Sequence, residues 1–206
     1  MKVLDYGFVK LIKHMGDDDF ICEAARLTTN SQGKDNERLI RYLMRNKHMS
    51  PFEFVEFVFH IKLPIFIARQ LVRHRTASIN ERSGRYTVLE ADCYKGIGKT
   101  QFEVYWEELS NEVPRETARL HLPLSTYTEM YWKMDLNNLL HFLELRLDKK
   151  AQSEMQEYAK AILELITPIV PKSIQAFMDY RINSVTLTQE QYAMYKSMQN
   201  LLGDTK

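Results

Sequence analysis

The side chains best suited to chemistry are concentrated in one short segment that is rich in arginine. Five arginines fall within 17 residues: Arg69, Arg73, Arg75, Arg82 and Arg85. The planar guanidinium donates two parallel hydrogen bonds to a carboxylate or a phosphate, so clustered arginines suit an anionic ligand. Small polar residues and a glycine are interleaved with them: Ser78, Asn80, Ser83 and Gly84. The segment therefore predicts a site for an anionic ligand with many hydrogen-bonding groups, most naturally a nucleotide.

Charge counting alone favours a simpler explanation, in which arginines at the end of a helix face solvent. The polar loop that is expected to follow the basic helix end favours a binding site instead. The chain contains neither GxGxxG nor GxxxxGK[ST]. A nucleotide bound here is therefore not held as in a Rossmann fold or a P-loop.

Two smaller groups of residues could complete such a site. His48 and Glu53 flank a turn that a proline fixes, and an ordinary polar turn explains them more simply than a pocket edge. Arg115 and Arg119 are one turn apart on a helix that is expected to follow residue 113. Both groups are candidates for the edge of a ligand site.

Arg146 stands out more than the exposed arginines because its surroundings in the sequence are apolar. The segment around it carries leucine and phenylalanine on nearly every side, which predicts a buried helix. A buried arginine must be paired or must face a ligand. An ion pair with an acidic neighbour such as Glu144 and a ligand contact are both open on this evidence.

Hydrophobic periodicity predicts the elements that position these residues. Strands are expected at 3–12, 52–63 and 86–88, with Phe57, Phe59, Ile61 and Leu63 on one face of the second. Helices are expected at about 17–27, 39–44, 64–75, 102–109, 114–122, 136–147, 151–166, 174–180 and 189–202, with loops at 76–84 and 94–100. The three aspartates at 17–19 are expected to cap the first helix rather than to bind a metal. Because strands and helices do not alternate as in βαβ units, we expect an α+β fold, with helices packed on a small, mainly antiparallel sheet, in a single domain over 1–206.

Composition excludes several classes of protein. The 206 residues are 45% hydrophobic and carry a net charge of +1, which argues against a dedicated nucleic-acid or membrane-surface binder. Two cysteines, Cys22 and Cys93, give neither a disulfide framework nor the spacing of a metal site. No apolar run approaches the roughly 20 residues of a membrane span, and the first residues do not resemble a signal peptide. A cytoplasmic protein without a metal is expected.

The arginine-rich segment resembles the signature of the flavin-dependent thymidylate synthases. The shared pattern is Arg73-His74-Arg75-x-x-Ser78-x-Asn80-x-x-Ser83-x-Arg85-Tyr86. Other landmarks of the family resemble this chain in the same order: His48-x-x-Pro-Phe-Glu53, Phe66-x-Ala-Arg-Gln70, Val113-Pro-Arg-Glu-x-Ala-Arg119 and Phe142-Leu-x-Leu-Arg146. The likeness runs from about Val3 to Tyr180, which is most of the chain.

The resemblance implies a reaction, a cofactor and an assembly. The family converts dUMP to dTMP with the carbon of methylenetetrahydrofolate and with reducing equivalents that pass from NADPH through FAD. Its members are homotetramers with active sites built between subunits. We therefore expect a methyltransferase with FAD as cofactor, NADPH and methylenetetrahydrofolate as co-substrates, and a tetramer as the working form.

The resemblance also implies a role for each residue that matches a family landmark. The residues expected to bind dUMP are Gln70, Arg73, Glu81, Ser83, Gly84, Arg85, Arg119 and Arg146. The residues expected to contact FAD are Ser50, Arg73, His74, Arg75, Glu81, Asp135, Asn137 and His141. His48 and Glu53 are expected to border the flavin and the folate. Arg146 is the expected catalytic residue, because a cation against the uracil ring favours its N3-deprotonated form.

One segment departs from the family pattern. Many members carry Asn-Ala-Arg where this chain has Asp135-Leu136-Asn137, and asparagine where it has His141. A flavin- or nucleotide-binding protein that has lost turnover would show such a change, and retention of FAD would separate that hypothesis from the enzyme. A nucleic-acid-binding role for residues 73–85 is the third hypothesis. It predicts binding to duplex that falls steeply with salt.

Overall fold

The structure is a computed structural model that describes residues 1–30 and 32–203. Its strands are β1 (Lys2–Val3), β2 (Gly7–Met15), β3 (Glu56–Pro64), β4 (Ser78–Glu81) and β5 (Tyr127–Asp135). Its main helices are α1 (Asp18–Thr29), α2 (Asn36–Arg45), α3 (Ile65–Leu71), α4 (Gln101–Ser110), α5 (Arg115–Ala118), α6 (Leu136–Arg146), α7 (Ser153–Ile166), α8 (Pro171–Phe177) and α9 (Gln189–Gly203). Short helical turns are η1 (Ser50–Phe54), η2 (Tyr94–Gly96), η3 (Arg119–His121) and η4 (Met178–Ile182).

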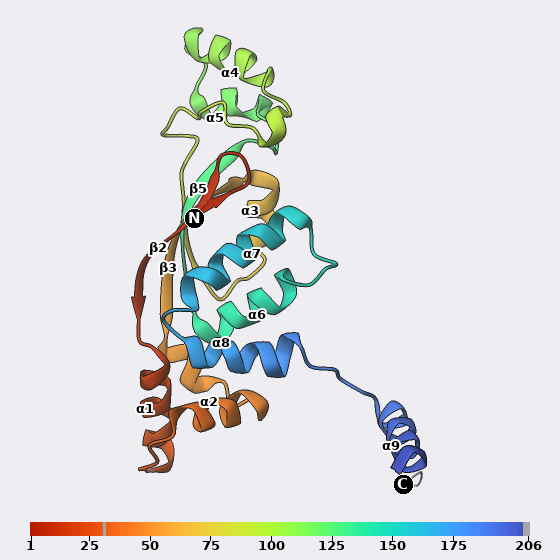
Figure 1. Cartoon of the computed structure of the whole chain (residues 1–206). Helices are drawn as coiled ribbons and strands as arrows, with labels where there is room; N and C mark the ends of the chain where they lie inside the picture. The colour runs from red at the N-terminus through yellow and green to blue at the C-terminus, as the bar shows by residue number, and fades with distance from the viewer. Residues whose placement is uncertain (31, 204–206) are drawn as a thin grey trace.

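The five strands form one antiparallel sheet in the order β1-β2-β3-β5-β4. Figure 1 shows α3, α6 and α7 on the same side of this sheet, which leaves its other face without a helical layer. The α+β architecture expected from the sequence is confirmed. Among the described residues, no helix is both long and apolar enough to cross a membrane.

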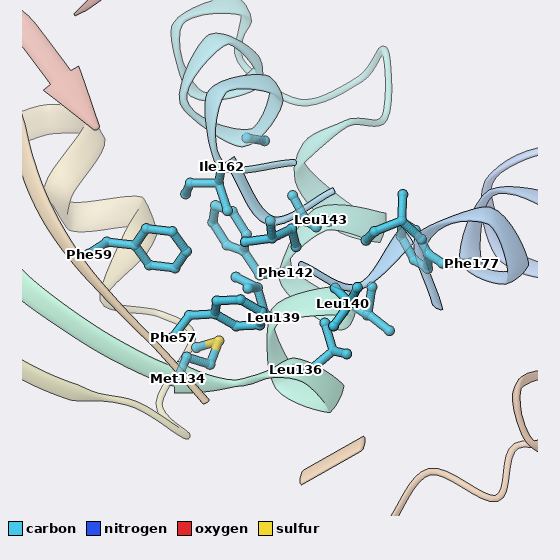
Figure 2. Packing of buried hydrophobic residues seen from close by; sticks show 14 of the residues in the cluster. Phe57, Phe59, Met134, Leu136, Leu139, Leu140, Phe142, Leu143, Ile162 and Phe177 are labelled. Carbon is cyan, nitrogen blue, oxygen red and sulfur yellow. The ribbon is translucent and has the colours of Figure 1, made fainter. Parts of the chain in front are cut away.

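The main core lies between the sheet and its helices. As the period of two predicts, alternate residues of β3 face inward, and Phe57, Phe59, Ile61 and Leu63 are all fully buried. Figure 2 shows Phe57 and Phe59 pointing from the sheet toward the side chains of α6, among them Phe142. Each such buried side chain contributes roughly 1.5–3 kcal/mol relative to exposure.

A second, smaller core lies at the end of the molecule that is uppermost in Figure 1. It packs α4 and α5 around Cys93, Phe102, Tyr105 and Ala118, separately from the main core. At the opposite end of the molecule in Figure 1, the C-terminal helix α9 stands away from the body and is joined to it by the exposed residues 184–188. The single domain over 1–206 stays a prediction, since Ser31 and residues 204–206 lie outside the described residues.

Several expected boundaries are wrong. Residues 86–88 are not a strand, since Tyr86 and Thr87 instead hydrogen-bond back to the Ser83 carbonyl in a turn. Residues 52–54 belong to η1, and the helix that follows Pro64 ends at Leu71 rather than near residue 75. The predicted loop at 76–84 contains β4.

The strand β5 has no counterpart among the sequence-based predictions, although it carries the signal of one. Met130, Trp132 and Met134 are buried, and they alternate with the less buried Tyr131 and Lys133. This alternation is typical of a strand with one face in a core. The strand lies between β3 and β4, so it holds the sheet together near the arginine-rich segment.

Of the three aspartates at 17–19, only Asp17 caps the first helix as predicted. Asp17 accepts hydrogen bonds from the backbone of Asp19 and Phe20 at the start of α1. The buried Asp18 instead caps α8, because its carboxylate accepts from the Lys172 backbone at 2.7 Å and from both the backbone and the hydroxyl of Ser173. Among the described residues, no cluster of three or more histidine, cysteine, aspartate or glutamate side chains could hold a metal ion.

Replacing Asp18 with alanine is expected to lower the free energy of unfolding by about 2–3 kcal/mol, because buried backbone donors of α8 lose a charged acceptor. Urea denaturation measures the change. Glu23→Ala, at an exposed position of α1, is the control and is expected to change the free energy of unfolding by less than about 0.5 kcal/mol. Equal losses for the two variants would show that Asp18 is not a cap.

Candidate active site

A hollow of about 340 Å³ opens where the chain leaves α3 and runs past α6. Two segments that are distant in the sequence line it: Arg73, His74, Arg75 and Thr76 after α3, and Met134, Asn138, His141, Leu145 and Arg146 from the end of β5 and from α6. The expected FAD residues 73–75 and the expected catalytic Arg146 thus line the same hollow. Thr76, Met134, Asn138 and Leu145 were missed from the sequence, although Asn138 and Leu145 follow helical spacing from Asp135 and His141.

Arg146 is half-buried at the last turn of α6, and its guanidinium is held by neutral partners. Its Nε donates to Nε2 of His74 at 3.1 Å, and its Nη2 approaches the Gln70 carbonyl at 3.5 Å. The ion pair with Glu144 that the sequence left open is not formed, because Glu144 pairs with Arg181 at 3.4 Å. The helix is also not buried all round, since Leu145 is 47% exposed beside the hollow.

The hollow carries positive charge without a compensating carboxylate. Among the described residues, no acidic side chain forms an ion pair with Arg73, Arg75 or Arg146. Burial, followed by the charges of Arg146 and His141, lowers the pKa of His74 to about 4. The imidazole of His74 is therefore neutral near pH 7. An anionic ligand would supply the missing negative charge.

The arginines farther along the signature behave differently. Arg82 pairs with Glu129 at 3.4 Å, and Arg85 pairs with Glu116 of α5 at 3.1 Å. These carboxylates tether the two guanidiniums to the protein surface. Charge counting alone, which treats all five arginines alike, could not separate them from the unpaired ones.

Residues 83–85 form a second group together with Arg119. A Cβ on Gly84 would lie 3.1 Å from Cδ of Arg119, so a larger residue there would crowd that side chain. The Ser83 hydroxyl accepts from the Arg85 backbone at 3.3 Å. Gly84 does not have a positive φ, so its role is close approach to Arg119.

The two groups lie apart within one chain. Figure 1 places α5, next to Arg119, near the upper end of the molecule, whereas α6 lies about halfway down, beyond α3 and α7. Gln70 and Glu81 are held by neutral partners. The Gln70 amide donates to the Gln152 side-chain oxygen at 2.5 Å, and Glu81 accepts from the Thr128 hydroxyl at 2.7 Å. One chain thus does not bring all the expected dUMP residues together.

The turn at 48–53 reaches the start of α6. Glu53 accepts from the Asn137 amide at 3.1 Å, and η1 packs on both α1 and α6. The His48 ring lies edge-on to Tyr42, with 5.8 Å between ring centroids. Ser50 is exposed beside an apolar groove between α1 and η1.

The first residue of the segment that departs from the family pattern, residues 135–141, has a structural role. Asp135 is the N-cap of α6: one carboxylate oxygen accepts from the Asn138 backbone at 3.0 Å and the other from the Asn138 amide at 2.6 Å. His141 is exposed one turn later, and its ring centroid lies 6.3 Å from that of His74. FAD contacts by Asp135, Asn137 and His141 stay predictions.

Comparison with known proteins gives consistent matches over most of the chain. Residues 10–172 match the family model described as thymidylate synthase complementing protein. A flavin-dependent thymidylate synthase of Treponema denticola is 40% identical over an alignment 235 positions long, which covers 96% of this chain and 88% of the relative. The chain belongs to the flavin-dependent thymidylate synthase family. A second member, from Thermus thermophilus, is 43% identical over 91% of this chain and 81% of its own length.

A solved structure supports the family fold independently. The UMP/dUMP methylase PolB of Streptomyces cacaoi, bound with 5-Br dUMP, superposes with a TM-score of 0.81 at 29% sequence identity. The superposition covers 88% of this chain and 98% of that chain. The resemblance read from the sequence is confirmed, and so is the fold class.

The capping role of Asp135 predicts unequal effects of two substitutions. Asp135→Ala is expected to lower the free energy of unfolding by about 1 kcal/mol. Asp135→Asn is expected to lower it by about 0.5 kcal/mol, because asparagine keeps the cap on the Asn138 backbone but cannot accept from the Asn138 amide as well. Guanidinium denaturation of the two variants measures the difference. If Asp135→Asn cost as much as Asp135→Ala, the carboxylate charge rather than the cap would be the stabilising feature.

Proposed function

We propose that this chain is a flavin-dependent thymidylate synthase that methylates dUMP to dTMP. Methylenetetrahydrofolate donates the carbon and NADPH donates the electrons through FAD. The working form is a cytoplasmic homotetramer with active sites shared between subunits. The observation that carries the proposal is the hollow around Arg146, whose cations lack acidic partners among the described residues and to which the family signature contributes Arg73, His74 and Arg75.

The residues around the hollow fit FAD by the chemistry of their donors. Arg73 and Arg75 are exposed and lack an acidic partner among the described residues, so they suit a diphosphate. Met134 and Leu145 add apolar wall suited to the face of a planar ring. Bound FAD supplies the relay of electrons from NADPH. Ser50, His74, Glu81, Asp135, Asn137 and His141 are the other proposed FAD contacts.

Arg146 is proposed to act on the uracil ring of dUMP. A guanidinium beside the ring N3–H lowers the pKa of that group by favouring the anion, which raises electron density in the pyrimidine. No carboxylate of the described residues neutralises Arg146, so its charge is available to the substrate. Gln70 lies next to it through its carbonyl contact. Arg73 is proposed to lie between FAD and the nucleotide.

The phosphate of dUMP is assigned to the second group of residues. Arg85 and Arg119 supply guanidiniums, Ser83 supplies a hydroxyl, and Gly84 lets the backbone approach. Glu81, at the end of β4, is proposed to contact both dUMP and FAD. His48 and Glu53 border the flavin and the folate, since η1 packs on α6.

The state of the two cysteines and of Ser83 supports a reaction that uses no cysteine or serine of the protein as a nucleophile. Cys22 and Cys93 are both buried, and burial raises the pKa of both thiols, to about 11 for Cys22. A thiol is a nucleophile only as the thiolate. Ser83 has no described histidine, lysine or carboxylate hydrogen-bonded to its hydroxyl. It is therefore assigned to binding.

The separation of the two groups supports an assembled site. One substrate must touch Arg146 with its ring and Arg119 with its phosphate, yet these residues lie in different parts of one chain. A neighbouring subunit can bring its own Arg119 to the first chain's hollow, as symmetric oligomers do with complementary surfaces. The cap gives Asp135 a structural role, and retention of FAD still separates the enzyme from a protein that has lost turnover.

Arg146→Ala is expected to lower kcat for dTMP formation at least about 100-fold, because it removes the charge that stabilises the developing anion. Chromatography of dTMP, with FAD, NADPH, dUMP and methylenetetrahydrofolate supplied under low oxygen, measures the rate. Arg45→Ala, at an exposed arginine of α2 outside the hollow and the family landmarks, is the matched control. Activity of Arg146→Ala near that of the wild type would remove the ring-activating role, and no dTMP from the folded wild type would reject the function.

Mixing two inactive variants tests the shared site. Arg119→Ala and Arg146→Ala are each expected to be nearly inactive alone. After subunit exchange, about a quarter of the sites would combine an intact Arg119 from one chain with an intact Arg146 from another, so roughly that share of activity should return. A mixture as inactive as its components would place both arginines of a site on one chain.

A further inference from the structure

In the hydrogen bond between Arg146 and His74, only the arginine can be the donor. The guanidinium is protonated at every relevant pH and its Nε carries a hydrogen, so it donates and His74 Nε2 accepts over 3.1 Å. An imidazole that accepts through Nε2 carries its single proton on Nδ1. The geometry therefore fixes both the charge and the tautomer of His74.

The position of the His74 ring is itself fixed from two sides. Its backbone N–H donates to the Leu71 carbonyl at 3.1 Å, directly after α3 ends. Its ring packs edge-on against the buried Phe142, with 4.9 Å between ring centroids. The acceptor atom thus rests on the end of a helix and on a core side chain rather than on a mobile loop.

The surroundings keep the ring neutral. The charged and titratable groups that line the hollow with it are Arg73, Arg75, His141 and Arg146. Burial opposes a second proton on the imidazole and lowers its pKa, and the charges of Arg146 and His141 act in the same direction. No acidic residue lines the hollow.

We propose that His74 is a positioning residue for Arg146, which it orients by accepting the Nε hydrogen. This inference rests on the proposed function, in which Arg146 acts on the uracil ring. Five N–H bonds radiate from the guanidinium. His74 takes the one on Nε and the Gln70 carbonyl approaches one on Nη2, while Nη1 has no partner among the described residues. The neutral acceptor thus holds the plane of the group without cancelling its charge, as a carboxylate partner would.

The tautomer is measured directly in the wild-type protein, without substrate. Long-range proton–nitrogen NMR correlation of the histidine rings at pH 7 is expected to show His74 neutral with its hydrogen on Nδ1. Detection of an imidazolium, or of hydrogen on Nε2, would overturn the inference whatever the activity of the enzyme.

Two substitutions of His74 test whether it orients Arg146 or only fills space. His74→Gln keeps an acceptor oxygen near the place of Nε2, whereas His74→Leu removes it. His74→Leu is expected to lower kcat about 10- to 100-fold, as misplacement of a catalytic group by roughly 1 Å does, with a smaller change in KM for dUMP. His74→Gln is expected to restore kcat to within about threefold of the wild type.

FAD retention and a control variant complete the experiment. If His74 served only as a FAD contact, both variants would lose FAD and activity to the same degree, and the positioning role would be overturned. Wild-type activity in His74→Leu would overturn it as well. His14→Gln, at an exposed histidine of β2 that does not line the hollow, is expected to leave kcat unchanged. A wild type without dTMP formation would reject the proposed function, while the NMR tautomer would still decide the role of His74.

Discussion

A row of aromatic rings connects the centre of the core to the hollow. Phe57 stacks on Phe59 with 6.1 Å between ring centroids, Phe59 lies 6.0 Å from Trp132, and Trp132 lies 5.1 Å from Phe142. Phe142 then meets the ring of His74 at 4.9 Å. Interiors pack as densely as organic crystals, so a ring in such a row cannot move without displacing its neighbours. The sheet and α6 therefore fix the place of the imidazole that touches Arg146.

The same arrangement explains how several cations can lie together without acidic partners. Arg73 follows the end of α3, and Arg146 occupies the last turn of α6. The carbonyl ends of helices carry partial negative charge, which stabilises a cation there by typically 0.3–1 kcal/mol. The neutral His74 adds an acceptor without adding charge. Exposure of Arg73 and Arg75 to water screens the remaining repulsion.

Sequence reasoning succeeded where the pattern was local. The alternation in β3 predicted its buried face, and the signature around Arg73 predicted the cluster of cations. It failed where tertiary contacts decide the outcome. The alternation in β5 was overlooked, and without that strand nothing in the sequence says that residues 78–81 pair with a neighbour rather than form a loop. Nor could spacing show that Glu144 turns to Arg181 and leaves Arg146 unpaired.

Under the proposed function, the pairing of the cations also divides the site into two parts. An arginine tethered to a carboxylate, as Arg85 is to Glu116, is held in place before a ligand arrives and exchanges part of that contact on binding. An arginine held by a neutral ring keeps its full charge for the ligand. The first arrangement suits recognition of a phosphate that is already an anion. The second suits a ring that must become one, because a carboxylate beside Arg146 would cancel the field that lowers the pKa of the ring N3–H.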